Sequence, residues 1–192
     1  MQTTVIRRAT PDDAAAIAAI YAYYVKNTAV TFENEPPGAE EIRERIETYS
    51  RRYPYLCITQ GDTIIGFAFA HHFRERPAYD YAAEVSIYLH HDHRRGGAGT
   101  LIYSALENEL KKMGVKSLYA CIAVPGGDDP HLTNASPLFH EKCGYHLCGT
   151  FRNCGRKFNK WYDMIWMGKI IGDFSDDPQP LIPYPDLRER SL

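Results

Sequence analysis

The stretch that decides the fold is Glu84-Val85-Ser86-Ile87-Tyr88-Leu89, followed after a histidine-rich turn by Arg94-Arg95-Gly96-Gly97-Ala98-Gly99-Thr100. Its first six residues alternate, which predicts a β-strand with three apolar side chains toward the core and Glu84, Ser86 and Tyr88 on the opposite face. Beyond the glycines, apolar residues recur at helical spacing until Gly114, which predicts a long helix. Its inward stripe would be Ile102, Leu106, Leu110 and Met113.

The glycine-rich turn suits a phosphate group. A turn between a strand and a helix directs backbone N–H groups to one point at the positive end of the helix dipole. The glycines at 96, 97 and 99 let the backbone approach a ligand, and Arg94 and Arg95 add charge. Two known phosphate loops are excluded, because no Gly-x-x-x-x-Gly-Lys-Ser/Thr occurs and Ile102 replaces the third glycine of a dinucleotide fingerprint. A plain helix start with permissive turn residues remains the alternative.

Strand and helix patterns surround this unit. Before it we expect a strand at residues 5–6, a helix capped by Thr10-Pro11-Asp12-Asp13, a helix at 39–52 and a hairpin of strands 56–60 and 63–73. After the long helix we expect a strand at 117–123, a short helix at 135–143 and strands at 145–152 and 160–168. Hairpins combined with a strand-helix-strand unit indicate an α+β (mixed α/β) fold.

The composition is that of one ordinary globular domain. The chain has 192 residues, of which 44% are hydrophobic and 24% charged, and this length suits one core. We expect the domain to span residues 1–171. From Gly172 onward the chain is rich in proline and acid. Residues 172–192 therefore read as an extended tail that lies along the domain or contacts a second copy.

Charge and hydropathy exclude several kinds of partner. With 22 Lys and Arg against 24 Asp and Glu, the chain has no global positive field that would attract nucleic acid or an anionic membrane. The longest apolar run, residues 64–70, is far shorter than the roughly 20 residues of a membrane span. The five cysteines contain no C-x-x-C pair, which predicts free, mostly buried thiols in a reducing cytosol.

An arginine followed by x-x-Gly-x-Gly directly after a strand resembles the pyrophosphate loop of the GNAT superfamily of acetyl-CoA-dependent N-acetyltransferases, with Arg94, Gly97 and Gly99 at the matching positions. The resemblance runs from residue 6 to about residue 169 and is closest to the phosphinothricin (methionine sulfoximine) acetyltransferase branch. It is carried by Ile6-Arg7 and Ala9, Thr31-Phe32-Glu33 with Glu35-Pro36, Arg74 and Arg76 with Ala78-Tyr79, Glu84 to Tyr88, His140-Glu141 with Gly144-Tyr145, Gly155 with Lys157-Phe158, and Trp161-Tyr162-Asp163.

The resemblance implies a GNAT fold, in which a central mixed, mostly antiparallel sheet is splayed at the cofactor site and flanked by helices. It also implies acetyl transfer from acetyl-CoA to the amine of a small amino-acid-like substrate of the phosphinothricin or methionine sulfoximine or sulfone type. An alkyl ammonium has a pKa of about 10, as lysine does, so a base must remove its proton. No metal takes part in the implied reaction.

Two catalytic residues follow from the resemblance. Glu84 lies at the position of the family's general base, although a surface carboxylate paired with an arginine would look the same. His140 lies where other members protonate the departing thiolate. It is expected to act as that acid or to orient a ligand, and the alternative is a structural histidine.

The resemblance further implies how the two substrates are held. Backbone groups of Ile87, Tyr88 and Leu89 would pair with the pantetheine arm and polarise the thioester carbonyl. The diphosphate contacts would be Arg94, Arg95, Gly96, Gly97, Ala98, Gly99 and Thr100. The acceptor contacts would be Phe32, Glu33, Arg74, Arg76 and Tyr79. Paired arginines suit a carboxylate or phosphinate, unless Arg74 and Arg76 are merely solvated loop charges.

One position departs from the family pattern. The asparagine often found three residues ahead of the loop serine is replaced by Thr133, and Asn134 stands one residue along, so its contact with the cofactor stays open. We expect no metal, because His90, His91 and His93 lack a carboxylate or cysteine partner at a known spacing.

Other functions stay open beside acetylation of a small molecule. The acceptor could be a protein N-terminus, a lysine or a polyamine, or the chain could be a catalytically idle CoA-binding module. The resemblance implies a homodimer, with the tail and residues 161–166 as candidate contacts. The expected location is the cytoplasm.

Overall fold

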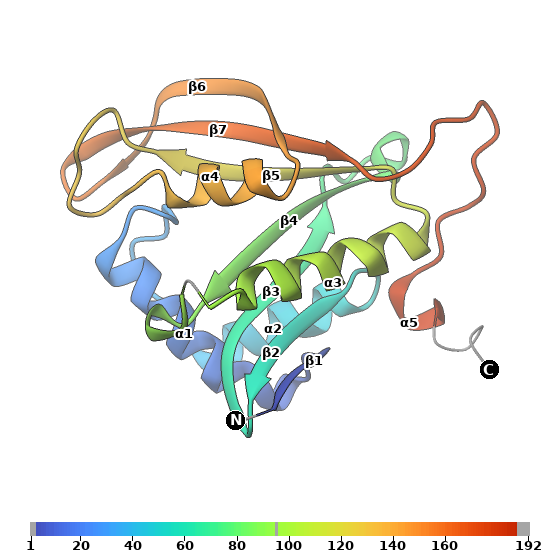
Figure 1. The fold of residues 1–192 in the computed structure, drawn as a ribbon, viewed down its shortest axis with the longest axis horizontal. Helices are drawn as coiled ribbons and strands as arrows, with labels where there is room; N and C mark the ends of the chain where they lie inside the picture. Colours follow the sequence, from blue (N-terminus) through green and yellow to red (C-terminus); the bar gives the residue numbers. More distant parts are fainter. Residues whose placement is uncertain (1–2, 95, 188–192) are drawn as a thin grey trace.

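A seven-stranded sheet forms the centre of the computed structural model, which describes residues 3–94 and 96–187 (Figure 1). In space its strands follow the order β1-β2-β3-β4-β5-β7-β6, and every neighbouring pair is antiparallel except the parallel pair β4 and β5. The strands are β1 (Thr4–Arg8), β2 (Tyr55–Gln60), β3 (Thr63–His72), β4 (Ala82–Leu89), β5 (Ser117–Val124), β6 (His146–Lys157) and β7 (Lys160–Ile170). The predicted mixed, mostly antiparallel sheet is confirmed.

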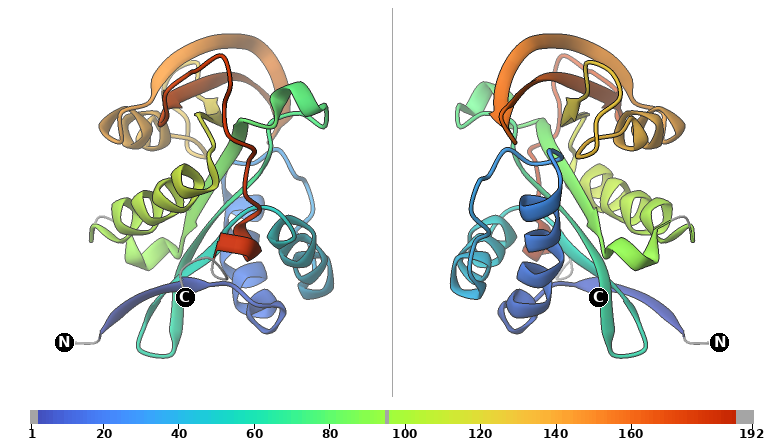
Figure 2. Two further views of the ribbon diagram at one scale, coloured as in Figure 1. Left: turned by 90° about the vertical axis from the view of Figure 1, so that its right-hand side faces the viewer. Right: turned by 90° about the vertical axis from the view of Figure 1, so that its left-hand side faces the viewer.

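Helices cover both faces of the sheet (Figure 2). They are α1 (Ala14–Asn27), α2 (Ala39–Ser50), α3 (Ala98–Met113), α4 (Ala135–Lys142) and α5 (Tyr184–Leu187), with 3-10 turns at Pro11–Asp13, Pro77–Tyr79 and His91–His93. The predicted α3 stripe is confirmed, because Ile102, Leu106, Leu110 and Met113 are all 0% exposed. It packs on β2 to β5, while α1 and α2 enclose a second core on the other face. Among the described residues, no helix has both the length and the apolar character needed to cross a membrane.

The start of α1 differs slightly from the prediction. Thr10 and Pro11 were expected to open the helix directly, but residues Pro11–Asp13 form a 3-10 turn and α1 begins at Ala14. The Asp13 carboxylate accepts a 2.7 Å hydrogen bond from the Thr10 backbone N–H and two more, of 2.7 and 2.8 Å, from Arg7. These bonds tie the end of β1 to the first turn of the helix.

The final hairpin is longer than predicted. The strand expected to end at residue 152 continues to Lys157, and the turn at Phe158 and Asn159 has positive φ angles of 48° and 58°. The β6–β7 register shifts between Phe151 and Gly155. This irregularity breaks the alternation on which the prediction relied, so the sequence pattern ends too early.

The C-terminal segment lies along the domain as far as Leu187. The Ile182 N–H donates to the Met113 carbonyl over 2.8 Å, and the Tyr184 N–H donates to the Arg52 carbonyl over 2.9 Å. Tyr184 is buried against α3 and β2. The described part of the segment therefore contributes to the core of its own chain, which is the first of the two expected placements.

The prediction of mostly buried thiols is wrong. All five cysteines are free, and only Cys57 is buried; Cys143 is partly buried. Cys121 is exposed because it lies on the face of β5 opposite the α3 core. Cys148 and Cys154 are exposed because β6 is the edge strand of the sheet.

Candidate active site

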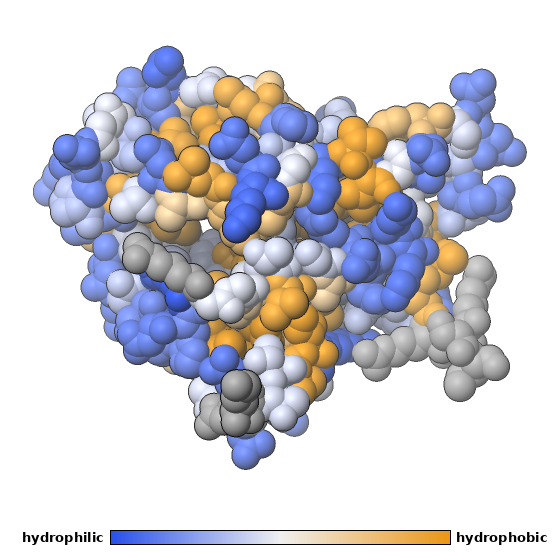
Figure 3. Space-filling view, viewed as in Figure 1, coloured by the Kyte–Doolittle hydropathy of each residue, from blue (hydrophilic) through white to orange (hydrophobic). Residues whose placement is uncertain are grey.

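The two central strands separate immediately after Glu84. Strands β4 and β5 pair only over Ala82–Glu84 and Ser117–Tyr119. From there β4 continues beside β3 alone and β5 beside β7 alone, so the strands diverge (Figure 1). The space-filling view shows a recess between the part of the surface over α4 and the part over α3 (Figure 3). The predicted splay of the sheet is confirmed, and Glu84 lies at its apex.

A pocket fills the gap between the diverging strands. Its walls come from β4, β5 and α4, with Ser86, Ile87 and Tyr88 on one side and Ser136 and His140 on another. The structure therefore brings Ile87 and Tyr88 to the pocket together with His140. Leu89 lies beyond the pocket, and its carbonyl accepts a 2.7 Å hydrogen bond from the Tyr24 hydroxyl.

The glycine-rich turn ends directly at the first turn of α3. Gly97 caps the helix with a φ of 82°, a left-handed conformation that glycine adopts without strain. A Cβ on Gly99 would lie 3.3 Å from Leu89 Cδ1 and 3.4 Å from the Phe139 ring, whereas one on Gly96 would meet open space. The first N–H groups of α3 have no partner within the helix, as at any helix start. Gly97 thus shapes the turn, and Gly99 lets α3, β4 and α4 approach one another.

The basic residues of the turn are only partly described. The Arg94 guanidinium lies near two α1 rings, 5.4 Å from the centroid of Tyr23 and 5.1 Å from that of Tyr24. Arg94 and Thr100 are both exposed, and Ala98 is buried in the first turn of α3. Arg95 lies outside the described residues.

Glu84 is largely buried at the apex of the splay. Its side chain is 20% exposed, and its Oε1 lies 3.9 Å from His71 Nε2 on β3. Burial raises the pKa of the Glu84 carboxyl group, and the charges of His71 and Arg74 oppose that rise. The carboxylate therefore holds a proton more readily than an exposed glutamate does, which suits a general base.

His140 lies on the buried face of α4, and both of its ring nitrogens have hydrogen-bond partners. Nδ1 lies 2.8 Å from the Ser136 carbonyl, so it must carry the proton and donate. Nε2 lies 3.0 Å from the Tyr103 hydroxyl and accepts its hydrogen. Burial lowers the pKa of His140, so the ring is neutral. In this arrangement both nitrogens already have partners, which favours an orienting role over direct proton donation.

Aromatic rings surround two of the predicted acceptor residues. The Arg74 guanidinium lies 4.6 Å from the ring centroid of Phe73 and 5.6 Å from that of Trp166. Phe73 also stacks on Tyr119 at 4.5 Å and contacts the predicted Tyr79 at 6.0 Å. Arg74 and Tyr79 thus belong to one exposed aromatic cluster at the end of β3.

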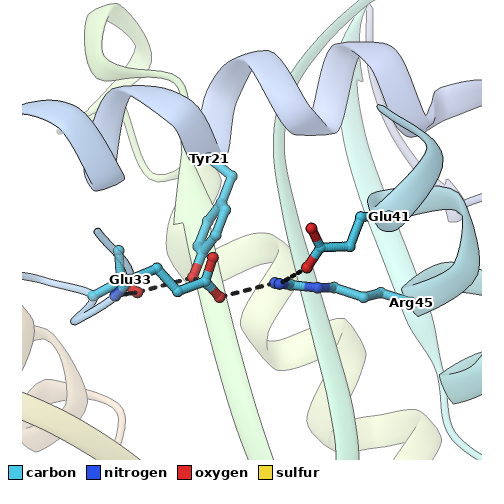
Figure 4. Close-up of polar contacts among 5 residues, drawn as sticks. Tyr21, Glu33, Glu41 and Arg45 are labelled. Atoms are coloured by element: carbon cyan, nitrogen blue, oxygen red, sulfur yellow. Dashed lines mark hydrogen bonds and ion pairs between the residues drawn. The ribbon is translucent and has the colours of Figure 1, made fainter. Parts of the chain in front are cut away.

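The other predicted acceptor residues lie elsewhere. Glu33 accepts hydrogen bonds of 3.1 Å from both the Tyr21 hydroxyl and Arg45, and Arg45 also pairs with Glu41 (Figure 4). Phe32 packs against the backbone of Gly155 on β6. These contacts hold the α1–α2 loop in place. Arg76 is exposed beside the turn Pro77–Tyr79.

Sequence reasoning missed several residues of the site. Phe73, Tyr119 and Trp166 come from three separate segments and meet only through the order of the strands. Tyr119 could have been found, because alternation along β5 places it opposite the buried Leu118 and Ala120. Tyr103 could not, because it lies beside the apolar stripe of α3 and reads as another core residue.

The histidine-rich turn contains a small cluster of possible metal ligands. Ligand atoms of His90, His91 and Asp92 lie within 4.8 Å of one another, so a carboxylate does accompany these histidines. The two imidazole rings, however, stack at 4.4 Å with their planes only 27° apart. Ring nitrogens bind a metal in the plane of the ring, so stacked rings do not converge on one ion.

Comparisons with known proteins agree with this geometry. Residues 6–166 match the family model described as the acetyltransferase (GNAT) domain. A phosphinothricin N-acetyltransferase of Streptomyces viridochromogenes is 33% identical over 179 residues, covering 93% of each chain. A phosphinothricin acetyltransferase of Sinorhizobium meliloti, solved in complex with AcCoA, superposes with a TM-score of 0.82 at 30% identity, covering 95% of this chain and 98% of that one. A ribosomal-protein-alanine N-acetyltransferase of Brucella melitensis superposes with a TM-score of 0.80 at 29% identity over 87% of this chain and 99% of that one.

The family model spans most of the chain, and it includes the splayed strands, the glycine-rich turn and α4. The chain belongs to the GNAT family of acetyltransferases.

Proposed function

We propose that this protein is an N-acetyltransferase that moves the acetyl group of acetyl-CoA to the amine of a small amino-acid-like substrate. The single observation that carries the proposal is the position of Glu84. A largely buried carboxylate lies at the apex of the splay, and the pocket between the diverging strands begins at the next residue of β4, Val85. Acetyl transfer needs a base and a thioester site side by side, and this arrangement supplies both.

The residues present fit acetyl-CoA. The start of α3 and the glycine-rich turn would hold the diphosphate, and Ile87 and Tyr88, in the stretch of β4 that does not pair with β5, would face the pantetheine arm. When bound, acetyl-CoA supplies the acetyl group as a thioester. In such sites, a backbone N–H directed at the thioester carbonyl lowers the activation free energy of the transfer by about 3 kcal/mol.

Proton transfer is assigned to Glu84. The ammonium N–H bond breaks, the proton passes to the Glu84 carboxylate, and the nitrogen lone pair is free to attack the thioester carbon. As the new C–N bond forms, the C–S bond breaks, and CoA leaves as the thiol with the second proton of the amine nitrogen. His140 is assigned an orienting role, because its donated Nδ1–H and the Tyr103 hydroxyl fix the ring and the first turn of α4.

The acceptor side favours a small anionic molecule. The Arg74 guanidinium lies close to the rings of Phe73 and Trp166, where its N–H groups suit a carboxylate or phosphinate. The likeness to phosphinothricin N-acetyltransferases supports the same class of acceptor. We propose Arg76 and Tyr79 as direct contacts of the acceptor. Phe32 and Glu33 are proposed to shape the acceptor site through the conformation of the α1–α2 loop.

The test is release of CoA thiol with a panel of amines, read together with a mass gain of about 42 Da, roughly one acetyl group for hydrogen, on the acceptor. We expect turnover with amino acids such as phosphinothricin and methionine sulfoximine, and a fall of about 100-fold or more in kcat in Glu84→Gln with unchanged acetyl-CoA binding. Turnover only with peptides or polyamines would replace the substrate class. Tight acetyl-CoA binding with no turnover on any amine would show an idle CoA-binding module.

We also propose a cytoplasmic homodimer. Leu147 and Phe151 on the edge strand β6, together with Trp161 on β7, expose large apolar side chains on one hairpin. An edge strand with such side chains is suited to contact a second copy. Five free cysteines are compatible with a reducing compartment. Light scattering of the purified protein tests the dimer, and a monomeric mass at micromolar concentration would exclude it.

A further inference from the structure

His71 stands directly opposite the proposed base. In the antiparallel register of β3 and β4, His71 is the partner of Glu84. Side chains of such partners extend from the same face of a sheet and reach one another. Here His71 Nε2 lies 3.9 Å from Glu84 Oε1, with the two side chains 27% and 20% exposed.

Hydrogen bonding identifies which ring nitrogen of His71 faces the Glu84 carboxylate. His71 Nδ1 lies 3.0 Å from the His72 carbonyl oxygen, which can only accept, so Nδ1 carries a hydrogen. Nε2 is the remaining nitrogen, and it faces the carboxylate. The ring is held in this orientation because it stacks on Tyr49 of α2, with centroids 5.2 Å apart and planes 28° apart.

We propose that His71 is a positioning residue of the acetyl-transfer site: a proton on Nε2 makes the ring a cation that keeps the Glu84 carboxylate ionised at lower pH. The inference rests on the proposed function of Glu84 as the base. His71 acts through Glu84 and needs no contact with either substrate. In the absence of this cation, burial acts on the carboxylate with less opposition, and Glu84 takes up a proton at higher pH.

Other ionisable groups face the pair from each neighbouring element. They are Tyr49 on α2, Arg74 after β3, and Tyr119 and Cys121 on β5. Arg74 is the other cation that stabilises the charged form of Glu84, but it is exposed and therefore screened by solvent. Cys121 has exposed surface but lines the pocket between β4 and β5, where desolvation by the surrounding protein and the nearby Glu84 charge raise the pKa of its thiol to about 12. The thiol therefore stays neutral near pH 7.

The chain offers a matched control in the adjacent residue. His72 points to the opposite face of β3, where its Nδ1 lies 3.4 Å from the Tyr53 hydroxyl. Replacing His72 by glutamine removes an imidazole from the same strand and leaves the Glu84 pair intact. Any effect that follows only from disturbing β3 should therefore appear in both variants.

The experiment compares kcat/KM across pH in the wild type, His71→Gln and His72→Gln. We expect the acidic limb of the kcat/KM profile to lie about one pH unit higher in His71→Gln than in the wild type, an effect typical of losing one nearby cation. At pH values above both limbs its kcat and KM should stay within about twofold of the wild type. The His72→Gln limb should coincide with that of the wild type. An unmoved limb in His71→Gln, or a lower plateau with an unmoved limb, would overturn the inference.

A second measurement does not depend on turnover. Titration of the Glu84 carboxyl carbon by NMR, in protein labelled with 13C on glutamate, reports its protonation midpoint directly. The midpoint should be higher in His71→Gln than in the wild type, and equal midpoints would refute the role of His71. If the wild type shows no turnover with any amine, the proposed function fails, whereas the NMR comparison still decides whether His71 controls the charge of Glu84.

Discussion

Burial acts in opposite directions on the two titratable groups at the splay. It raises the pKa of Glu84, because a carboxylate loses hydration, and it lowers the pKa of His140, because an imidazolium does. Glu84 has His71 nearby to compensate, while His140 has two neutral hydrogen-bond partners. The splay therefore has a carboxylate at its apex that can accept a proton, and an imidazole in its pocket that stays neutral and fixed.

The Tyr103–His140 bond gives the first prediction. Tyr103→Phe removes the hydroxyl that donates to His140 Nε2 and leaves a buried acceptor without a partner. We expect a loss of about 1–2 kcal/mol in the free energy of unfolding, measured by urea denaturation. Tyr81→Phe serves as a control, because that hydroxyl bonds only weakly, over 3.3 Å or more, to the C-terminal segment. Equal stability of Tyr103→Phe and the wild type would show that the bond does not hold α4.

At the scale of the element, a charged capping contact between β1 and α1 makes the stability of the protein depend on pH in the acid range. Arg7 hydrogen bonds lower the pKa of Asp13 against the opposing effect of burial. The stabilisation is therefore present above the ordinary Asp pKa, about 4, and is lost as pH falls through the lower folded value. Asp13→Asn keeps a capping side chain but removes the charge, and should cost about 1 kcal/mol at pH 7 because Arg7 is partly exposed.

The pH dependence provides the check on Asp13. The stability difference between the wild type and Asp13→Asn, from urea unfolding at several pH values, should shrink steadily below pH 4. A difference that stays constant from pH 7 to the acid range would mean that the Arg7 contact contributes no charge-dependent stability.

The start of α3 gives a third prediction. Gly99→Val would place methyl groups against Leu89 and Phe139, which already lie 3.3–3.4 Å from a Cβ. The helix must shift, so we expect a raised KM for acetyl-CoA, by about tenfold or more, and a lower melting temperature. Gly126→Ala, in the loop after β5, meets open space and should change both by little. A Gly99→Val enzyme with normal KM would separate the helix start from cofactor binding.

Elements could be predicted from the sequence wherever the pattern was local. The alternation of residues 84–89 and the stripe on α3 predicted the central strand and helix correctly, because each is set by neighbours in the chain. The end of β6 was missed because a register shift interrupts the alternation. Partners brought together by strand pairing, such as His71 with Glu84, carry no local signal, so this part of the site required the structure.

At the scale of the whole molecule, the N-terminal and C-terminal halves are joined by contacts of the α1–α2 loop with the β6–β7 hairpin. Phe32 packs on Gly155, and the Lys157 ammonium group donates a 2.8 Å hydrogen bond to the Thr31 carbonyl. The α1–α2 loop is thus attached to the β6–β7 hairpin, more than 120 residues away in sequence. This contact links the position of the loop to that of the hairpin.

That link gives a fourth prediction. Gly155→Ala adds a Cβ into the Phe32 ring and should loosen the loop, raising the KM for the acceptor several-fold and exposing residues 28–38 to proteolysis. Phe32→Leu in the same chain makes room and should restore part of the loss. The coupling is measured by a double-mutant cycle on acceptor KM. Strictly additive effects would show that the two positions do not act on each other.

The whole account depends on the start of α3 holding the diphosphate of CoA beside the splayed strands. Calorimetric titration with CoA and with pantetheine, which lacks the diphosphate, tests this most directly. We predict saturable binding of one CoA per chain, and binding of pantetheine weaker by about 100-fold, since the charge-assisted contacts at the helix start are lost. No heat with CoA, or equal affinity for the two ligands, would contradict the account.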